Sequence, residues 1–327
     1  MKPKIFISKA IPLEVEKYIS QHCDYEKWES EESISRDSLL NKLENADGLL
    51  TSGEQINEEL LLSAPRLKVV SNMSVGYNNF DIPAMKKRGV LGTHTPGILD
   101  GSVADLTFGL ILSAARRIPE MDQHIKEGSW EPGDDRKYFG LDVHGTKLGI
   151  IGMGRIGKEV ARRGKYGFNM DVLYHNRNRD HEFEETTGAR FCSLNELLQE
   201  SDVIVLLIPL TEDTVNFIGQ NEFNQMKSTA IFINVSRGQT VDEDALIHTL
   251  EREGIYAAGL DVFHEEPLTT TSGLKKLKNV VMTPHIGTAT LKTRSDIAML
   301  AAQNLVLTLN GEKQNVVKEM QPESAIK

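Results

Sequence analysis

Three short segments in the second half of the chain carry side chains that could act together on one substrate. They contain Arg237, Glu266 and His285, and all three follow a glycine-rich segment at 152–157. An arginine can bind a carboxylate through paired N–H groups, and a histidine beside a carboxylate can transfer a proton near neutral pH. Downstream of a dinucleotide-binding segment, these groups would suffice to reduce a keto acid with a hydride cofactor.

Each of the three residues has a chemical role in such a reaction. Arg237 can hold the carboxylate and the keto oxygen of a 2-keto acid, which orients the substrate and polarises its carbonyl group. His285 can donate the proton that this oxygen takes up, because the ordinary pKa of a histidine is about 6.5. Glu266 would fix the histidine tautomer and favour its protonated form. Taken singly, each could be an ordinary surface residue; their order and spacing together indicate a site.

The glycine-rich segment at 152–157, GMGRIG, has the spacing of a dinucleotide-binding turn. It follows an apolar strand expected at 147–151 and opens an expected helix. In this setting Gly152 permits the tight turn, Gly154 lets the backbone approach a pyrophosphate, and Gly157 lets helix and strand pack closely. The helix N-terminus would then face the phosphates with the amides of Arg155 and Ile156.

The end of the next strand, expected at 171–175, indicates which dinucleotide binds. An NAD site normally has Asp or Glu about 20 residues after the fingerprint, where it binds the ribose hydroxyls. This chain has Asn176, Arg177 and Arg179 there, and its first acid is Asp180. Arginines attract a 2′-phosphate, which a carboxylate would repel. The sequence therefore predicts a preference for NADP(H), with NAD(H) as the alternative.

The elements that must position these residues follow from the apolar periodicity. The first 100 residues alternate apolar strands with amphipathic helices, which predicts a parallel sheet covered on both faces, and a second βα series starts at 147. Between them we expect one long apolar helix over 103–126, with Ser102 as its N-cap, followed by a polar loop at 128–140. The expected strands are 4–8, 48–52, 68–72, 90–93, 147–151, 171–175, 203–208, 230–235, 258–262 and 280–283, and the other expected helices are 12–20, 36–45, 58–64, 82–88 and 291–309.

Composition excludes several classes of protein. With 37 basic and 47 acidic residues the formal charge is −10, which disfavours a nucleic-acid or anionic-membrane binder. No segment approaches the roughly 18 consecutive apolar residues of a membrane span, and the N-terminus does not read as a signal peptide. Cys23 and Cys192 are far apart, as expected of reduced thiols, and no Cys/His cluster has metal-ligand spacing. We expect a cytoplasmic protein without a metal site.

Over nearly its whole length the chain resembles the D-isomer-specific 2-hydroxyacid dehydrogenases, most closely the branch of glyoxylate/hydroxypyruvate and 2-ketogluconate reductases. The resemblance implies an α/β fold of two flavodoxin/Rossmann-like domains with parallel sheets. The substrate domain would comprise 1–100 and 289–327, with the dinucleotide-binding domain, 101–288, inserted into it. The segments that carry the resemblance are the glycine fingerprint, 70–78, 103–107, 174–177, 209–211, 234–238, 258–262 and 283–287.

The resemblance also implies further site residues. Because the histidine's partner in this family directly precedes a proline, it favours Glu266 over Glu265. Asp261 would accept a hydrogen bond from the nicotinamide carboxamide. The implied substrate contacts are Thr51, Ser52, Gly53 and the amides of Val75 and Gly76. The other implied cofactor contacts are Thr107, Asn176, Arg177, Arg179, Pro209, Thr214, Val235, Ser236 and Gly287, besides the fingerprint.

The activity that the resemblance implies is NADPH-dependent reduction of glyoxylate, hydroxypyruvate or 2-ketogluconate to D-2-hydroxy acids. One alternative is 3-phosphoglycerate dehydrogenase or another NAD-using D-2-hydroxyacid dehydrogenase; a phosphorylated substrate would call for more cations. Another is a non-catalytic, dinucleotide-sensing corepressor. The apolar helix expected at 103–126 suggests a homodimer, and in relatives the region of 128–140 can reach a neighbouring subunit's active site.

Overall fold

The computed structural model describes residues 2–30, 32–133 and 135–321. The chain divides into two compact units, Met1–Leu99 with Ala289–Lys327, and Asp100–Thr288. Residues 322–327, which the sequence analysis places in the substrate domain, lie outside the described residues. Each unit has its own parallel sheet and its own apolar core. The prediction of two α/β domains with parallel sheets is therefore confirmed.

The first unit has a five-stranded sheet in the order β2-β1-β3-β4-β5, all parallel. This is the doubly wound order in which the chain reverses direction beside the first strand. The strand β2 was not predicted from the sequence, because three of its four residues, Asp-Tyr-Glu-Lys, are charged and none is buried, as suits an edge strand. The strands are β1 (Lys4–Ile7), β2 (Asp24–Lys27), β3 (Gly48–Thr51), β4 (Val69–Asn72) and β5 (Leu91–Thr93), and the helices are α1 (Leu13–His22), α2 (Arg36–Leu43), α3 (Glu58–Ser63), α4 (Ile82–Arg88) and α12 (Leu291–Leu309).

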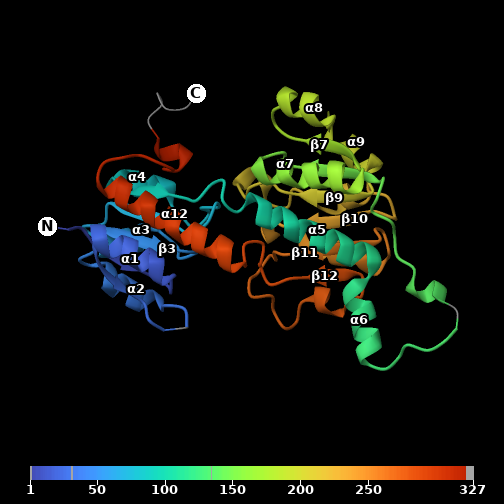
Figure 1. Cartoon of the computed structure of the whole chain (residues 1–327), viewed down its shortest axis with the longest axis horizontal. Helices are drawn as coiled ribbons and strands as arrows, with labels where there is room; N and C mark the ends of the chain where they lie inside the picture. The colour runs from blue at the N-terminus through green and yellow to red at the C-terminus, as the bar shows by residue number, and fades with distance from the viewer. Residues whose placement is uncertain (1, 31, 134, 322–327) are drawn as a thin grey trace. The chain divides into compact units, whose positions relative to one another are not determined.

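The C-terminal helix α12 belongs to this first unit. Figure 1 shows α12, in red, beside the blue strands of the N-terminal segment. The buried hydroxyl of Ser71, on β4, donates a 2.7 Å hydrogen bond to the carbonyl of Ala301 on α12. Asn304, on the same helix, donates from Nδ2 to the carbonyl of His94 at 2.9 Å. These bonds tie the two ends of the chain into one body.

The second unit has a seven-stranded parallel sheet in the order β12-β11-β10-β9-β6-β7-β8. The chain starts in the middle at β6, builds outward through β7 and β8, and then returns to β9 on the other side of β6. In such sheets ligands bind outside the carboxyl ends of the strands where the order reverses. The strands are β6 (Lys147–Ile151), β7 (Asp171–His175), β8 (Arg190–Phe191), β9 (Val203–Leu206), β10 (Ile231–Asn234), β11 (Ala257–Leu260) and β12 (Val280–Met282), and the helices after β6 are α7 (Arg155–Arg162), α8 (His181–Thr187), α9 (Leu194–Glu200), α10 (Gln220–Phe223) and α11 (Glu243–Glu251).

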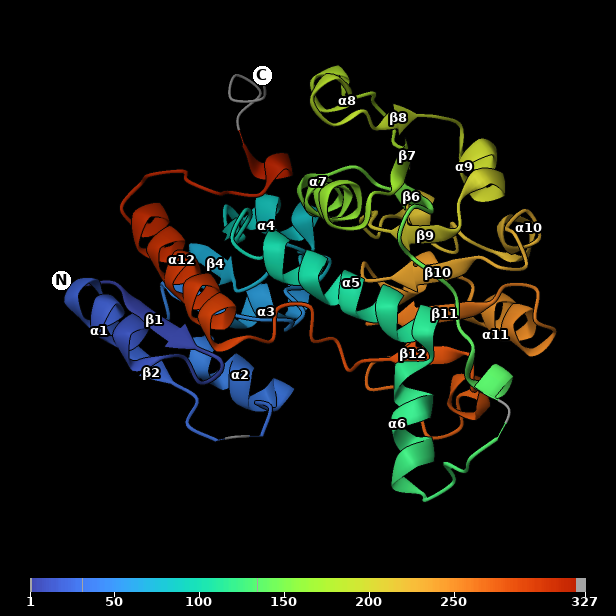
Figure 2. The same ribbon diagram turned by 45° about the vertical axis from the view of Figure 1, so that its right-hand side comes forward.

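The single helix expected at 103–126 is two helices, α5 (Asp100–Arg116) and α6 (Ile118–Lys126). Arg117 breaks the helix because it adopts a left-handed conformation with φ 53°, and Pro119 follows in the first turn of α6. Figure 2 shows α6 turning sharply away from the end of α5. The start was also wrong, because Ser102 lies inside α5, where its hydroxyl donates to the carbonyl of Gly287 at 2.9 Å.

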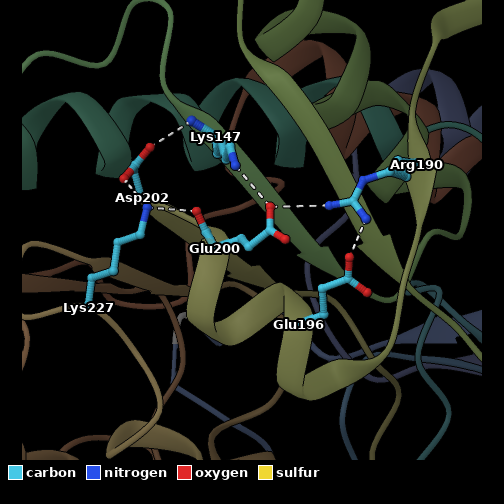
Figure 3. Close-up of polar contacts among 6 residues, drawn as sticks. All are labelled: Lys147, Arg190, Glu196, Glu200, Asp202 and Lys227. Atoms are coloured by element: carbon cyan, nitrogen blue, oxygen red, sulfur yellow. Dashed lines mark hydrogen bonds and ion pairs between the residues drawn. The ribbon is translucent and has the colours of Figure 1, made fainter.

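A network of charged residues joins the elements at the amino ends of the strands of the second unit, as Figure 3 shows. Lys147 Nζ lies 2.9 Å from Glu200 Oε2, and Lys227 Nζ lies 2.7 Å from Asp202 Oδ1. Arg190 bridges Glu200 and Glu196, both on α9. The network lies at the opposite edge of the sheet from the carboxyl ends, so we assign it to stability rather than to ligand binding.

The described residues hold no helix that is long and apolar enough to cross a membrane.

Candidate active site

The ring of His285 and the carboxylate of Glu266 form a direct pair. Nδ1 of His285 lies 2.7 Å from Oε2 of Glu266, and the amide of Phe263 donates to Oε1 at 3.0 Å. Glu266 lies in the loop after β11, and His285 follows the neighbouring strand β12. Of the two adjacent carboxylates, the one that the sequence analysis favoured over Glu265 makes the contact. With Nδ1 bound to the carboxylate, Nε2 is the ring atom that can exchange a proton with a substrate.

The backbone of His285 is held in an unfavourable conformation. Its φ is 52°, in the left-handed region, which costs a residue with a side chain about 1–2 kcal/mol. The carboxylate of Asp261 offsets this cost because it accepts hydrogen bonds from the amides of Ile286 and Gly287, at 2.8 and 2.9 Å. It also accepts one from the hydroxyl of Thr283 at 2.6 Å. Asp261 therefore anchors the histidine segment, a role that the sequence analysis missed.

Arg237 lies in a turn directly after β10, the strand next to β11. The buried side chain of Asn234 shapes this turn: its Nδ2 donates to the carbonyl of Arg237 at 3.0 Å, and its Oδ1 accepts from the amide and hydroxyl of Ser236. The guanidinium donates from Nη1 to the carbonyl of Ser236 at 2.6 Å. Arg237 and the His285–Glu266 pair thus follow three adjacent strands.

Gly238 lets the arginine turn approach the loop that carries Glu266. A Cβ atom on Gly238 would lie 1.8 Å from the carbonyl carbon of Phe263 and 1.9 Å from its oxygen. No side chain fits at those distances. Since the amide of Phe263 also binds Glu266, this close backbone contact couples the arginine turn to the position of the carboxylate.

The charges of the three residues influence one another. Burial raises the pKa of Glu266, but the hydrogen bonds from His285 and from the Phe263 amide, with the charges of His285 and Arg237, outweigh it and leave that pKa below its usual value. Burial lowers the pKa of Arg237, and the charge of Glu266 counters this effect. A guanidinium ordinarily titrates above pH 12, so Arg237 stays cationic. At neutral pH the site therefore holds an ionised carboxylate and a cation beside the imidazole ring.

The glycine fingerprint has the shape that a dinucleotide requires. Gly152 has φ 102°, and a Cβ there would lie 2.8 Å from the backbone of Leu207. A Cβ on Gly157 would lie 2.6 Å from the carbonyl oxygen of Gly152, so this glycine lets helix and turn pack together. At Gly154 a Cβ would meet no atom within 4 Å, so this backbone borders open space. The residues present thus fit a pyrophosphate, which the first-turn amides of α7, including those of Arg155 and Ile156, would bind.

The residues expected at the adenosine end follow β7 and β9. Asn176 is half-buried, whereas Arg177 and Arg179 are exposed. Arg179 forms an ion pair with Glu184 that the sequence analysis did not foresee. Pro209 and Thr214 share a turn, because the hydroxyl of Thr214 donates to the carbonyl of Pro209 at 2.7 Å.

Four other expected cofactor contacts are buried in the second unit. Thr107 is fully buried on α5, and its hydroxyl donates to the carbonyl of Val103 at 2.7 Å, so it exposes no atom to a ligand. Val235 and Ser236 are buried where β10 ends. Gly287 is also buried, and its contacts are with Asp261 and Ser102.

The residues expected to bind substrate gather at one edge of the sheet of the first unit. Thr51 ends β3 and Ser52 and Gly53 follow it, whereas Val75 and Gly76 follow the neighbouring strand β4. The carbonyl of Val75 accepts from Nδ1 of His94 at 2.9 Å, and the carbonyl of Gly76 accepts from Nδ2 of Asn72 at 2.9 Å. Thr51 is fully buried, and its hydroxyl binds Ser8 and Glu54.

Comparison with known proteins places the chain in a family. The family model described as "D-isomer specific 2-hydroxyacid dehydrogenase, NAD binding domain" matches residues 108–287. Glyoxylate/hydroxypyruvate reductase B of Yersinia enterocolitica is 45% identical over 311 residues, which cover 95% of each chain. The corresponding protein of Enterobacter sp. strain 638 is 44% identical over 311 residues, 95% of this chain and 96% of that protein.

Solved structures show the same likeness. A glyoxylate reductase from Paecilomyes thermophila has a TM-score of 0.88 at 29% identity, covering 98% of this chain and 99% of that one. An NADPH-dependent glyoxylate/hydroxypyruvate reductase from Sinorhizobium meliloti, in complex with NADP and malonate, has a TM-score of 0.84 at 28% identity and covers 98% of each chain. From the fold, the site and these matches, the chain belongs to the D-isomer-specific 2-hydroxyacid dehydrogenase family.

Proposed function

We propose that this protein catalyses the NADPH-dependent reduction of small 2-keto acids to D-2-hydroxy acids. Glyoxylate and hydroxypyruvate are the first candidate substrates, and 2-ketogluconate is the next. The observation that carries the proposal is the 2.7 Å contact between His285 and Glu266, one strand away from Arg237. The names of the bacterial relatives support the same class of substrate.

In the proposed reaction Arg237 binds the substrate and His285 donates the proton. The guanidinium forms charge-assisted hydrogen bonds to the substrate carboxylate and keto oxygen, which orients the acid and polarises its carbonyl group. A bound nicotinamide dinucleotide supplies the hydride. Nε2 of His285 gives its proton to the oxygen as negative charge develops there. Glu266 stabilises the imidazolium and holds the tautomer that has hydrogen on Nδ1.

We also propose which residues would hold the dinucleotide and the substrate carboxylate. The amides at the start of α7, with Gly154 beside open space, would bind the pyrophosphate. Arg177, exposed after β7, would bind the 2′-phosphate that distinguishes NADP from NAD. In the first unit the amides of Val75 and Gly76, whose carbonyls are bound by other groups, would bind the substrate carboxylate.

A spectrophotometric assay tests this proposal. NADPH and NADH are each mixed with enzyme and with glyoxylate, hydroxypyruvate, 2-ketogluconate or pyruvate, and the loss of nicotinamide absorbance is followed. The proposal expects faster oxidation of NADPH than of NADH with at least one of the first three acids. Oxidation of NADH alone would contradict the cofactor preference. Binding of a dinucleotide without turnover of any acid would contradict the reductase activity.

We further propose that the protein forms a homodimer, but not through the apolar helix from which a dimer was inferred in the sequence. The apolar residues of α5 are buried in its own unit, against α7 and the strands β10 to β12. Large apolar side chains are exposed instead on α6 and in the loop after it, at Ile118, Ile125, Trp130 and Phe139. Residue 134 of that loop lies outside the described residues, and the short helix Asp135–Tyr138 follows it.

Light scattering after size-exclusion chromatography tests the dimer. We expect twice the chain mass of 36.5 kDa. Ile125→Glu should yield monomer, because it places a charge among the exposed apolar residues. Leu62→Glu, which changes an exposed leucine on α3 in the other unit, is the matched control and should leave the mass unchanged. A wild-type protein that elutes as monomer would remove this proposal.

A further inference from the structure

The connection between β7 and α8 contains two arginines with different surroundings. Arg179 forms a two-pronged ion pair with Glu184: Nε lies 2.9 and 3.0 Å from the two carboxylate oxygens, and Nη2 lies 2.7 Å from Oε2. Paired N–H groups on one carboxylate give a strong and geometrically specific interaction. The guanidinium of Arg179 is therefore already bound to a carboxylate of the protein.

Glu184 is held in place by a buried tyrosine. Tyr174, on β7, is fully buried, and its hydroxyl donates to Oε1 of Glu184 at 2.7 Å. The same hydroxyl accepts from the amide of Asp180 at 2.8 Å, so it is fixed from both sides. The bonds from Arg179 and then from Tyr174 lower the pKa of Glu184 to about 2. Glu184 is therefore an anion at neutral pH.

Two other charged pairs lie near this connection. Lys158 Nζ lies 2.5 Å from Asp180 Oδ2, and Arg162 Nη1 lies 2.6 Å from Glu159 Oε1. Arg177 differs from them, because it is exposed and the described part of the chain offers it no hydrogen-bond or ion-pair partner. A phosphate dianion arriving here would meet one unengaged guanidinium and two carboxylates, Asp180 and Glu184, whose charges are already compensated.

We propose that Glu184 helps to determine the specificity for NADP over NAD. It holds Arg179 in an internal ion pair, so that Arg177 alone binds the 2′-phosphate. This inference rests on the proposed preference for NADP(H). It revises the interpretation from sequence, in which Arg177 and Arg179 attract the phosphate together. Arg179 acts indirectly, because its charge cancels that of Glu184, which would otherwise repel the phosphate.

The proposal makes opposite predictions for changes at the two ends of the ion pair. Glu184→Gln removes the negative charge and releases Arg179, so affinity for a 2′-phosphate should rise. Arg179→Gln leaves Glu184 uncompensated, so affinity should fall. The double variant removes both charges and should return the affinity to that of the wild type. A direct phosphate contact by Arg179 would leave the double variant as weak as Arg179→Gln.

Isothermal titration calorimetry with adenosine 2′,5′-bisphosphate and with 5′-AMP measures the affinity for a 2′-phosphate in the absence of turnover. Arg177→Gln should weaken bisphosphate binding about tenfold or more, the loss of one charge-assisted bond. Its affinity for 5′-AMP should stay within about twofold of the wild type, because 5′-AMP lacks the 2′-phosphate. Arg190→Gln, an exposed arginine on β8 paired with Glu196, is the matched control and should change neither affinity.

Glu184→Gln should tighten bisphosphate binding about threefold or more, and Arg179→Gln with Glu184→Gln should match the wild type within about twofold. If Arg179→Gln and the double variant both lose as much affinity as Arg177→Gln, the inference is overturned while the NADP preference stands. If the wild type binds bisphosphate no better than 5′-AMP, the NADP preference fails and the inference with it. The comparison of Arg177→Gln with Arg179→Gln remains informative even if Glu184→Gln fails to fold, because both of these variants keep Glu184.

Discussion

The carboxylate of Glu266 bridges two loops, with one oxygen 2.7 Å from Nδ1 of His285 and the other bonded to the amide of Phe263. Because both oxygens are bound, the carboxylate has one orientation, and it fixes the ring of His285 in turn. Asp261 holds the backbone directly after His285, through the amides of Ile286 and Gly287. The ring of His285, which we propose as the proton donor, is therefore already positioned in the protein without a bound substrate, the arrangement that makes electrostatic catalysis effective.

Replacing Glu266 by glutamine tests its charge. The amide can still accept a hydrogen bond from Nδ1, but it stabilises imidazolium less than a carboxylate does. We expect turnover to fall about tenfold or more, equivalent to about 1.4 kcal/mol of transition-state stabilisation. Glu265→Gln, at the exposed neighbouring residue, is the control, and unchanged turnover in Glu266→Gln would remove the assigned role.

The contact between Gly238 and Phe263 predicts a strong effect of one added methyl group. Gly238→Ala should force the arginine turn away from the loop after β11, since its Cβ has no room. We expect KM for the keto acid to rise and the free energy of unfolding to fall by on the order of 2 kcal/mol. Gly167→Ala adds a methyl group where nothing lies within 4 Å and is the control. Equal effects of the two changes would show that the close contact does not matter.

The ion-pair network at the amino ends of the strands predicts a pH dependence of stability. Bonds from Lys147 hold the pKa of Glu200 below its usual value of 4.5. Because the folded-state pKa is the lower one, ionised Glu200 stabilises the folded protein above about pH 4.5, and this contribution is lost as the pH falls further.

Thermal unfolding from pH 7 to pH 3 measures that contribution. Glu200→Gln should unfold at a lower temperature than the wild type at pH 7, and the difference should shrink below about pH 4.5. Glu185→Gln, at an exposed residue of α8, should unfold like the wild type at each pH. A difference between Glu200→Gln and the wild type that grows toward acid pH would contradict the sign of this argument.

The sequence predicts best where local pattern decides the structure. The strand before Gly152, the fingerprint turn and the order of βα units follow from apolar periodicity and glycine spacing, and the structure has them. The strand β2 was missed because its charged residues form an exposed edge. The break at Arg117 was missed because the apolar pattern continues through it, although Pro119 marks the place where a new helix starts.

Side-chain pairings that depend on how the chain folds between the two residues could not be predicted in this way. The choice of Glu266 over Glu265 came from the resemblance, and the structure agrees because Glu266 contacts His285. The pairing of Arg179 with Glu184 depends on how α8 folds back beside Tyr174, which no local pattern encodes. The anchoring of the His285 segment by Asp261 likewise depends on the neighbouring positions of β11 and β12.

The most direct test of the account is single-turnover reduction by His285→Ala. The enzyme is preloaded with NADPH and mixed with glyoxylate or hydroxypyruvate in a stopped-flow spectrometer, and NADPH affinity is measured separately by fluorescence. His264→Ala, which removes an exposed histidine close to Glu266 in sequence, is the control. We predict that His285→Ala slows reduction about 10²- to 10⁴-fold, the usual contribution of a general acid, with NADPH affinity nearly unchanged. Reduction at the wild-type rate in His285→Ala would contradict the assignment of His285 as proton donor.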